Sequence, residues 1–473
     1  MSIRREQIES IVNEVLLQLG ASAGEQTSLN STGDWGVFER LEDAVSAAQE
    51  AFPRISTLAE RERVIKTIRR AARGNARRLA EMAVHETGMG RIEDKVKKNL
   101  LTAERTPGPE ILSPNAISGD TGLTLIENAP WGVIASVTPS TNPAATIMNN
   151  AISMLSGGNS VVFAPHPSAK RITQETIKML NKAVAEETGI NNLLTCVKEP
   201  SIEIAQQLFT YPGIKLLVVT GGEAVVEAAR EITNKRLIAA GAGNPPVVVD
   251  ETANLPRAAK SIYDGASFDN NIICCDEKEI IAVDSIADEL KREMVACGAM
   301  EITREQAESV AKAVLLDYPG PNCRPNPKWV GRDASELAMA GGFSVQESCR
   351  LLIVDVGSDI DYVFARIEQM MPLVPVLRAR DFDQALQWAL TLERGLMHTA
   401  GLHSTNIDNM DAMATQVNTS LFVKNGPHVA GLGAGGEGWT SMTISTPTGE
   451  GVTNAATFVR YRRCTLVGSF RIV

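Results

Sequence analysis

The sequence predicts an α/β protein with more than one parallel sheet. A first set of short runs rich in β-branched residues lies at 132–137, 160–165, 216–221 and 245–250. Helical stretches separate these runs, which is typical of parallel strands joined by crossover helices in a doubly wound sheet. A second set follows at 279–283, 350–356, 373–379, 399–404 and 420–425. Because 473 residues exceed what one core holds, we expect two or three domains.

The first twenty residues form a segment of their own. Apolar side chains recur there at the spacing of one helical face: Ile8, Ile11, Val12, Val15, Leu16 and Leu19. Residues 21–35 are small and polar, which predicts a flexible linker. A helix of this length is marginal alone, so we expect it to dock onto a partner.

Composition limits the classes of partner. The formal net charge is −10, so nucleic acid and anionic membrane surfaces are disfavoured. No apolar run approaches the roughly 20 residues that a membrane span needs, and nothing resembles a cleavable signal peptide. We therefore expect a protein of the cytosol, a reducing compartment.

The seven cysteines agree with that compartment. They are odd in number and lack framework spacing, so a disulfide scaffold is not expected. No CxxC pair occurs and the five histidines form no HxxxH pattern, so we expect no metal site. For the adjacent Cys274 and Cys275, the roles of nucleophile and of small core residue both stay open at this point.

Two glycine-rich segments are candidate phosphate loops. The segment that starts at Gly431, "GLGAGGEG", contains GxGxxG but is followed by no helical pattern, so close backbone approach is the better interpretation. In "LLVVTGGEAVVEAAR" a strand ends at Gly221 and Gly222 and a helix follows at once. Free amides at that helix start would suit a pyrophosphate, although a plain turn explains the pattern equally well.

Seven segments in order carry a family resemblance: "ETGMG" (86–90), "ENAPWGVIASVTPSTNP" (127–143), "FAPHPSAKR" (163–171), "VVTGGE" (218–223), "GAGNPPVVVD" (241–250), "SFDNNIIC" (267–274) and "EQMMPLVPV" (368–376). The chain resembles the aldehyde dehydrogenase superfamily, in its CoA-acylating branch. Within that branch it is most similar to the enzymes of bacterial ethanolamine and propanediol microcompartments, the ethanolamine type more closely. The resemblance spans nearly the whole chain.

The resemblance implies an aldehyde dehydrogenase-like fold with three parts. A Rossmann-like NAD-binding domain would comprise 36–112 and 131–242, and an α/β catalytic domain 243–445. A small β oligomerisation arm would comprise 113–130 and 446–473 and build a homodimer or homotetramer. Residues 1–20 would be an amphipathic targeting helix that binds a microcompartment shell protein, which places the enzyme in the microcompartment lumen within the cytoplasm; an oligomer-packing helix is the alternative.

The implied activity is the oxidation of a short-chain aldehyde, acetaldehyde or propionaldehyde, with NAD and CoA to acyl-CoA. The family nucleophile falls on Cys274, which would form a thiohemiacetal and then a thioester. Cys275 would then be a small hydrophobe facing the other way, as neighbours in an extended segment do. The oxyanion donor of the "TPSTNP" loop falls on Thr141, with Asn142 next to it, and both remain candidates.

A missing carboxylate bears on the product. Hydrolytic members have a glutamate that activates water, and Ala240 stands at that position here. Thiolysis by CoA is therefore expected over hydrolysis, with Glu277 as the alternative base. A hydrolytic dehydrogenase and a catalytically silent microcompartment scaffold are the competing hypotheses for the whole chain.

For the cofactor, Glu368 matches the glutamate that holds the ribose on the nicotinamide side. The family's adenine-ribose Lys and Glu are replaced by Ala164 and Pro167. His398 is a further candidate for the active-site side. The other cofactor-binding residues that the resemblance implies are Thr138, Pro139, Ser140, His166, Gly221 and Gly222.

Overall fold

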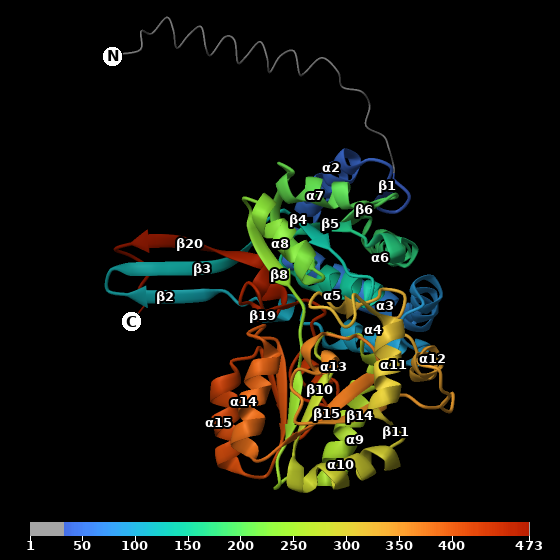
Figure 1. The fold of residues 1–473 in the computed structure, drawn as a ribbon. Helices are drawn as coiled ribbons and strands as arrows, with labels where there is room; N and C mark the ends of the chain where they lie inside the picture. Colours follow the sequence, from blue (N-terminus) through green and yellow to red (C-terminus); the bar gives the residue numbers. More distant parts are fainter. Residues whose placement is uncertain (1–32, 473) are drawn as a thin grey trace, which may run out of the picture.

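The computed structural model describes residues 33–472 and shows two α/β lobes with a β arm projecting from the side (Figure 1). The predicted helix at 1–20 and the linker up to residue 32 lie outside the described residues. They stay predictions, as do the limits of the domains. Within residues 33–472, no helix is long and apolar enough to cross a membrane.

The first lobe is built on a six-stranded sheet in the order β1-β6-β5-β4-β7-β8. Every neighbouring pair in it is parallel, as the alternation of strands and helices predicts. The predicted runs at 132–137, 160–165 and 216–221 became three of its strands. The six strands are β1 (Val37–Phe38), β4 (Val133–Val137), β5 (Ser160–Ala164), β6 (Leu194–Val197), β7 (Ile214–Thr220) and β8 (Arg236–Ala240).

Helices cover both faces of this sheet because its side chains alternate and both sets are apolar. On one face Ile134 and Leu216 pack under α3 (Leu58–Thr87), α5 (Pro143–Ser156) and α6 (Lys170–Thr188). On the other face Ala135 and Leu217 pack under α2 (Leu41–Ala51), α7 (Ile202–Thr210) and α8 (Glu223–Ile232).

The second lobe is built on a seven-stranded sheet in the order β11-β14-β15-β10-β9-β16-β17. Its strands are β9 (Pro246–Val249), β10 (Glu279–Val283), β11 (Met300–Ile302), β14 (Leu352–Gly357), β15 (Leu373–Ala379), β16 (Thr399–His403) and β17 (Leu421–Lys424), all in parallel pairs. The strand pattern grouped the run at 245–250 with the first set, and that grouping was wrong, whereas the catalytic domain implied by the resemblance, 243–445, included it. A continuous Val-Val-Val run fits any buried parallel strand, so the run alone does not say which sheet it joins.

Helices again lie on both faces of the second sheet (Figure 1). One face packs against α9 (Leu255–Ala266) and α10 (Asp284–Ala296). The opposite face packs against α11 (Arg304–Val314), α12 (Ala334–Ala340), α13 (Val363–Arg366), α14 (Phe382–Glu393) and α15 (Ile407–Val417).

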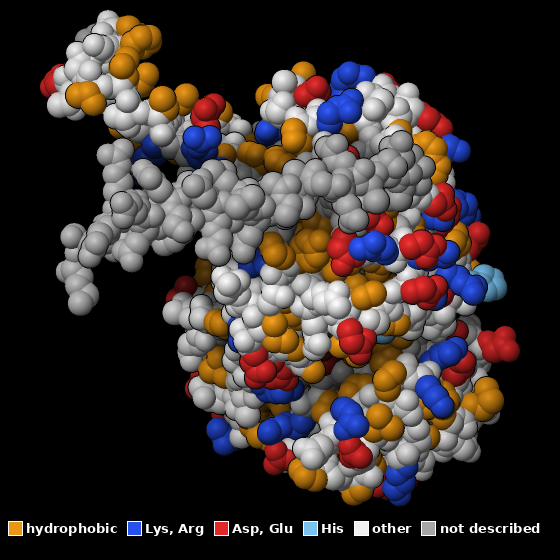
Figure 2. All heavy atoms as spheres, turned by 90° about the horizontal axis from the view of Figure 1, so that it is seen from above, with side chains coloured by type: hydrophobic (Ala, Val, Ile, Leu, Met, Phe, Trp, Pro, Cys, Tyr) orange, Lys and Arg blue, Asp and Glu red, His pale blue; other side chains and the backbone are white. Residues whose placement is uncertain are grey.

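The arm is an antiparallel sheet of β2 (Asn115–Gly119), β3 (Gly122–Pro130) and β20 (Val459–Val467). It joins residues more than 300 positions apart, for example Tyr461 opposite Asn128. Figure 2 shows apolar side chains on the projecting arm, and its exposed ones include Ile117, Leu466 and Val467. An oligomer contact through this arm remains a prediction.

A tight turn at the end of helix α3 lies at the boundary between the lobes. The helix begins with a capping box, in which the Thr57 hydroxyl accepts from the Glu60 amide. It ends where Gly88 adopts a left-handed conformation with φ 67°. The turn leads into α4 (Ile92–Arg105), which packs along α3 and faces the loop of the two cysteines.

Candidate active site

The cysteine pair lies in a loop between α9 and β10, residues 268–278, which we call the nucleophile loop. It opens with a short left-handed turn within Phe268–Asn271, in which three successive residues have positive φ. The φ angles are 46° for Asp269, 57° for Asn270 and 63° for Asn271. Asp and Asn are the non-glycine residues that tolerate this region best, but three in a row need support from outside the loop.

Part of that support comes from hydrogen bonds of the Asn270 and Asn271 side chains. The Asn270 side-chain oxygen accepts from Arg91 Nε at 3.0 Å, and its Nδ2 donates to the Gly331 carbonyl at 2.8 Å. The Asn271 Nδ2 donates to the backbone carbonyls of Ala266 and Glu277, both at 2.9 Å. Residues from both sides of the loop therefore hold its backbone in place.

The two cysteines occupy a turn, closed by a hydrogen bond from the Asp276 amide to the Ile273 carbonyl at 3.1 Å. The expectation of an extended segment was therefore wrong, although the two cysteines do differ in burial. Cys275 is completely buried in a small apolar cluster with Ile273, Leu421, Leu432 and Ile444. Cys274 is only half-buried.

The Cys274 thiol is in a setting that disfavours its anion. Burial raises its pKa to about 12, and the nearby Glu368 carboxylate adds to the rise. The structure thus brings Glu368, predicted to hold the cofactor, within electrostatic range of the predicted nucleophile. A thiol with this pKa is neutral at pH 7 and needs a base or a bound positive charge to react.

The four charged residues after the cysteines, 276–279, are all buried. The Lys278 ammonium donates to the carbonyl and side-chain oxygens of Asn271 at 2.7 Å and to the Ile273 carbonyl at 3.2 Å. Burial raises the pKa of Asp276 to about 8 and that of Glu277 well above its usual range. These carboxyl groups are held in their neutral form by burial.

Glu277 is enclosed away from solvent. One carboxyl oxygen accepts from the His428 amide at 2.8 Å, and the other lies 2.1 Å from where a Cβ on Gly265 would stand. Only glycine fits at position 265. A group so enclosed and protonated is poorly placed to activate water at Cys274.

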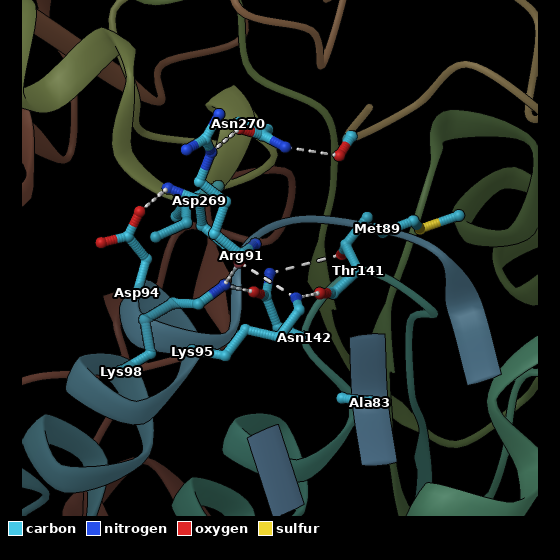
Figure 3. Close-up of polar contacts among 12 residues, drawn as sticks. Ala83, Met89, Arg91, Asp94, Lys95, Lys98, Thr141, Asn142, Asp269 and Asn270 are labelled. Atoms are coloured by element: carbon cyan, nitrogen blue, oxygen red, sulfur yellow. Dashed lines mark hydrogen bonds and ion pairs between the residues drawn. The ribbon is translucent and has the colours of Figure 1, made fainter. Parts of the chain in front are cut away.

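The "TPSTNP" loop, residues 138–143, follows β4 and leads into α5. Thr138 is tied to the next strand, because its amide donates to the Ala164 carbonyl at 3.1 Å. Lys95 on α4 donates to the Thr141 carbonyl at 3.0 Å, and Lys98 donates to the Asn142 side-chain oxygen. The same two ammonium groups contact the Asp269 carboxylate, so α4 links this loop to the nucleophile loop (Figure 3).

The residues predicted to hold the pyrophosphate lie at the switch point of the first sheet, where strand order reverses between β4 and β7. Gly222 is the N-cap of α8, which has no side-chain cap, and a Cβ there would meet no atom within 4 Å. The Gly221 amide, however, already donates to the Ala240 carbonyl at 3.1 Å. The Gly222 end of the turn therefore fits a dinucleotide phosphate better than Gly221 does.

His166 has a structural task beside its predicted one. Its Nδ1 accepts from the Ser168 amide at 3.2 Å, which caps the short turn Pro167–Ala169 at the end of β5. The ring is exposed. A contact with a cofactor stays a prediction for this residue and for Pro139 and Ser140, which lie half-buried in the loop after β4.

His398 lies close to the nucleophile loop. The sequence indicates it only as a candidate for the active-site side. A Cβ on Gly243 would stand 2.8 Å from its Cγ and 2.7 Å from the Cys274 carbonyl, so the glycine backbone lies against both residues. Burial lowers the His398 pKa to about 4, and its Nδ1 pairs with the Thr399 hydroxyl at 2.8 Å. Its Nε2 has no hydrogen-bond partner among the described residues.

Comparison with known proteins identifies the family of the chain. A profile of the aldehyde dehydrogenase family matches residues 36–308. The chain is 66% identical over its full length to an acetaldehyde dehydrogenase (acetylating) of Bilophila wadsworthia, and covers 100% of it. It is 57% identical to the acetylating acetaldehyde dehydrogenase EutE of Salmonella typhimurium, with 100% of both chains covered. The chain belongs to the aldehyde dehydrogenase family, in its CoA-acylating branch.

Solved structures of this family superpose closely. A propionaldehyde dehydrogenase from the fucose utilisation microcompartment of Clostridium phytofermentans matches with a TM-score of 0.90 at 41% identity, covering 93% of this chain and 100% of that one. A propionaldehyde dehydrogenase of Rhodopseudomonas palustris, solved with bound CoA and an acylated cysteine, matches with a TM-score of 0.89 at 43% identity, covering 92% and 99%. An engineered glycolyl-CoA reductase solved with NADP⁺ also reaches 0.89, at 42% identity and 93% and 99% coverage. The aldehyde dehydrogenase-like fold is thereby confirmed.

Proposed function

We propose that the protein oxidises a short-chain aldehyde, acetaldehyde or propionaldehyde, to its acyl-CoA in a reversible reaction. The single observation that carries this is the contrast between a half-buried Cys274 and an alanine, Ala240, where hydrolytic relatives have their base. The relatives at 57–66% identity are named as acetylating enzymes, which supports the same reaction.

Cys274 is the proposed nucleophile, and the buried Cys275 is a small packing residue. The Cys274 thiol first loses its proton to solvent, and addition of the thiolate to the aldehyde carbonyl then makes a thiohemiacetal alkoxide. The Cys274 amide and a side chain of the "TPSTNP" loop, Asn142 or Thr141, donate to that oxygen. A nicotinamide cofactor bound beside Glu368 would supply the hydride acceptor that this oxidation needs, and Cys274 would keep the acyl group as a thioester.

His398 is the proposed proton acceptor for the incoming CoA thiol. Its ring is neutral at pH 7 because burial lowers its pKa to about 4, and its Nε2 is free of hydrogen bonds among the described residues. The Gly243 backbone lies against both the His398 ring and the Cys274 carbonyl, so a neutral imidazole there can take the thiol proton as the CoA sulfur attacks. CoA then leaves as acyl-CoA, and the Cys274 thiolate is released.

The absence of a carboxylate at Ala240 determines the fate of the thioester. Ala240 is buried at the end of β8, and Glu277 is enclosed behind Gly265, so neither can activate water. The test is NADH formation from acetaldehyde with and without CoA. We expect one turnover per site without CoA and steady turnover with it; continuous release of free acetate without CoA would contradict the proposal, and no NADH under either condition would favour a silent scaffold.

NAD is the proposed cofactor, held by Glu368 through the ribose hydroxyls on the nicotinamide side and by the Gly222 end of α8 through the phosphates. The residues at the adenine-ribose positions, Ala164 and Pro167, bring no charge that would attract or repel a 2′-phosphate. Comparing kcat/KM for NAD and NADP tests this choice, and a higher value for NADP would overturn it.

Residues 1–20 are proposed to bind a microcompartment shell protein, and the arm to hold the enzyme as a dimer or tetramer. Several aliphatic side chains on one face, each worth about 1.5–3 kcal/mol when buried, can offset the ordering of a short helix. Deleting residues 1–20 should leave kcat and KM nearly unchanged and free the enzyme from the shell. Loss of the oligomer in the truncated enzyme would instead assign these residues to the enzyme's own assembly.

A further inference from the structure

Two lysines of α4 are buried between the lobes. Lys95 and Lys98 expose 4% and 2% of their surface, and Asp269, their shared anionic partner, exposes none. Lys95 Nζ donates to Asp269 Oδ2 and to the Thr141 carbonyl, each at 3.0 Å. Lys98 Nζ donates to the same Asp269 oxygen and to Asn142 Oδ1 (Figure 3).

The contact with Lys98 determines which way the Asn142 amide points. An ammonium group only donates, so the atom that faces Lys98 must be the amide oxygen. The amide nitrogen then lies on the opposite side, where it donates to the Thr141 hydroxyl at 3.3 Å. One N–H of this amide is left for another acceptor.

We propose that Lys98 is a positioning residue that orients the Asn142 amide as a donor to the alkoxide formed on Cys274. The inference rests on the proposed acylating function and names Asn142, rather than Thr141, as the side-chain donor. The Thr141 hydroxyl accepts a hydrogen bond from the Asn142 amide and is the second group that holds this amide in place. Asp269 completes the arrangement, because its carboxylate ties Lys98 to the nucleophile loop.

The position of Asp269 is itself closely determined. Its Oδ1 accepts from the Arg91 amide at 2.7 Å and lies 2.0 Å from where a Cβ on Gly90 would stand. Gly90 has a φ of 75°, so only glycine fits this turn. The turn after α3 thus places the carboxylate, the carboxylate places Lys98, and Lys98 places the amide.

The test compares Lys98→Met, Asn142→Ala and the double variant in the full-length enzyme. Lys98→Met keeps the length of the side chain, and Asp269 retains Lys95 as its cation. We expect each single variant to lower kcat for acetaldehyde by about 10²–10³-fold, the usual loss for one oxyanion donor. The double variant should lose no more than Asn142→Ala alone, because Lys98 acts through Asn142.

Alkylation of Cys274 by iodoacetamide separates orientation from structural damage. This reaction forms no alkoxide, so its rate in Lys98→Met should stay within about twofold of the wild type. Lys97→Met is the matched control: it removes the same charge from the same helix at an exposed position and should leave kcat unchanged.

Losses that multiply in the double variant, or a matching fall in the alkylation rate, would overturn the proposal. So would an unimpaired Lys98→Met. The wild type in the same assay distinguishes failure of the proposed function from failure of this inference. A wild type that forms no NADH with acetaldehyde and CoA refutes both proposals. An active wild type whose two single variants have independent, multiplying losses refutes only the role of Lys98.

Discussion

Glu277→Gln tests the raised pKa of the buried carboxyl group in the nucleophile loop. The wild-type carboxyl group accepts one hydrogen bond from the His428 amide, and its second oxygen has no partner among the described residues. Burial raises its pKa well above 4.5. Glutamine has the same shape and does not titrate, so the substitution removes only the cost of ionising the buried group.

The sign of the effect follows from proton binding. The folded-state pKa is raised, so between about pH 4.5 and that pKa the folded protein binds more protons than the unfolded chain. The contribution of this group to wild-type stability is therefore greatest at low pH, and it falls by about 1.36 kcal/mol per pH unit as pH rises. An unfolding entropy of about 2.1 cal/mol/K per residue amounts to about 1 kcal/mol/K for this chain of 473 residues. The Tm of Glu277→Gln minus that of the wild type should then increase by about 1 °C for each unit by which pH rises.

The assay is thermal unfolding of both proteins at pH 6, 7, 8 and 9, with Glu347→Gln as a control at an exposed position. The control should show no trend with pH relative to the wild type. A Tm difference that shrinks or stays constant as pH rises would refute the reasoning. Activity and CoA dependence should be preserved in Glu277→Gln; free acetate production that disappears in the variant would show that Glu277 does activate water.

Three further outcomes are expected. Cys274→Ala should abolish NADH formation with the fold intact while Cys275→Ala keeps most activity; the reverse pattern would shift the nucleophile by one residue. Because burial raises the Cys274 pKa to about 12, its alkylation rate in the free enzyme should rise about tenfold per unit from pH 7 to 9, and a plateau in that range would contradict the raised pKa. A Cβ at position 222 would meet no atom within 4 Å, so Gly222→Val should leave Tm unchanged. Its side chain would occupy the space proposed for the cofactor phosphates and should raise the KM for NAD; an unchanged KM would favour a plain turn.

The sheets could be predicted from sequence because their strands are short β-branched runs that end at turn residues. β15, Leu373–Ala379, has the predicted bounds, and β4 and β16 differ from theirs by one residue. Short or weakly branched strands such as β1, β6 and β11 gave no comparable signal. The sheet to which β9 belongs depends on how the chain crosses between lobes at 241–245, and no local pattern encodes that crossing.

The site was predicted less completely than the fold. The resemblance pointed to Cys274, Glu368 and the "TPSTNP" loop, and the structure brings Glu368 within electrostatic range of Cys274. No sequence signal marked the lysines of α4, because a group such as Lys95, Lys97 and Lys98 is typical of a solvated helical face. Only the packing shows that two of them are buried against Asp269 while Lys97 stays exposed. The left-handed turn before Cys274 was equally invisible, since Asp-Asn-Asn is compatible with many loops.

The buried stretch 276–279 bears on when the nucleophile becomes reactive. Its three carboxyl groups have raised pKa values because of burial, so the Lys278 ammonium faces neutral neighbours there. A cation beneath Cys274 favours the thiolate, yet burial outweighs it and the thiol pKa is raised to about 12. The resting enzyme therefore keeps Cys274 as a neutral thiol, which is a poor target for oxidants and alkylating agents. We therefore expect the thiol to become reactive when the cofactor binds. A positive nicotinamide ring near Glu368 would offset the carboxylate charge, which is the second cause of the raised Cys274 pKa. Saturating NAD should then accelerate Cys274 alkylation at pH 7, and an unchanged rate would show that burial alone controls the thiol.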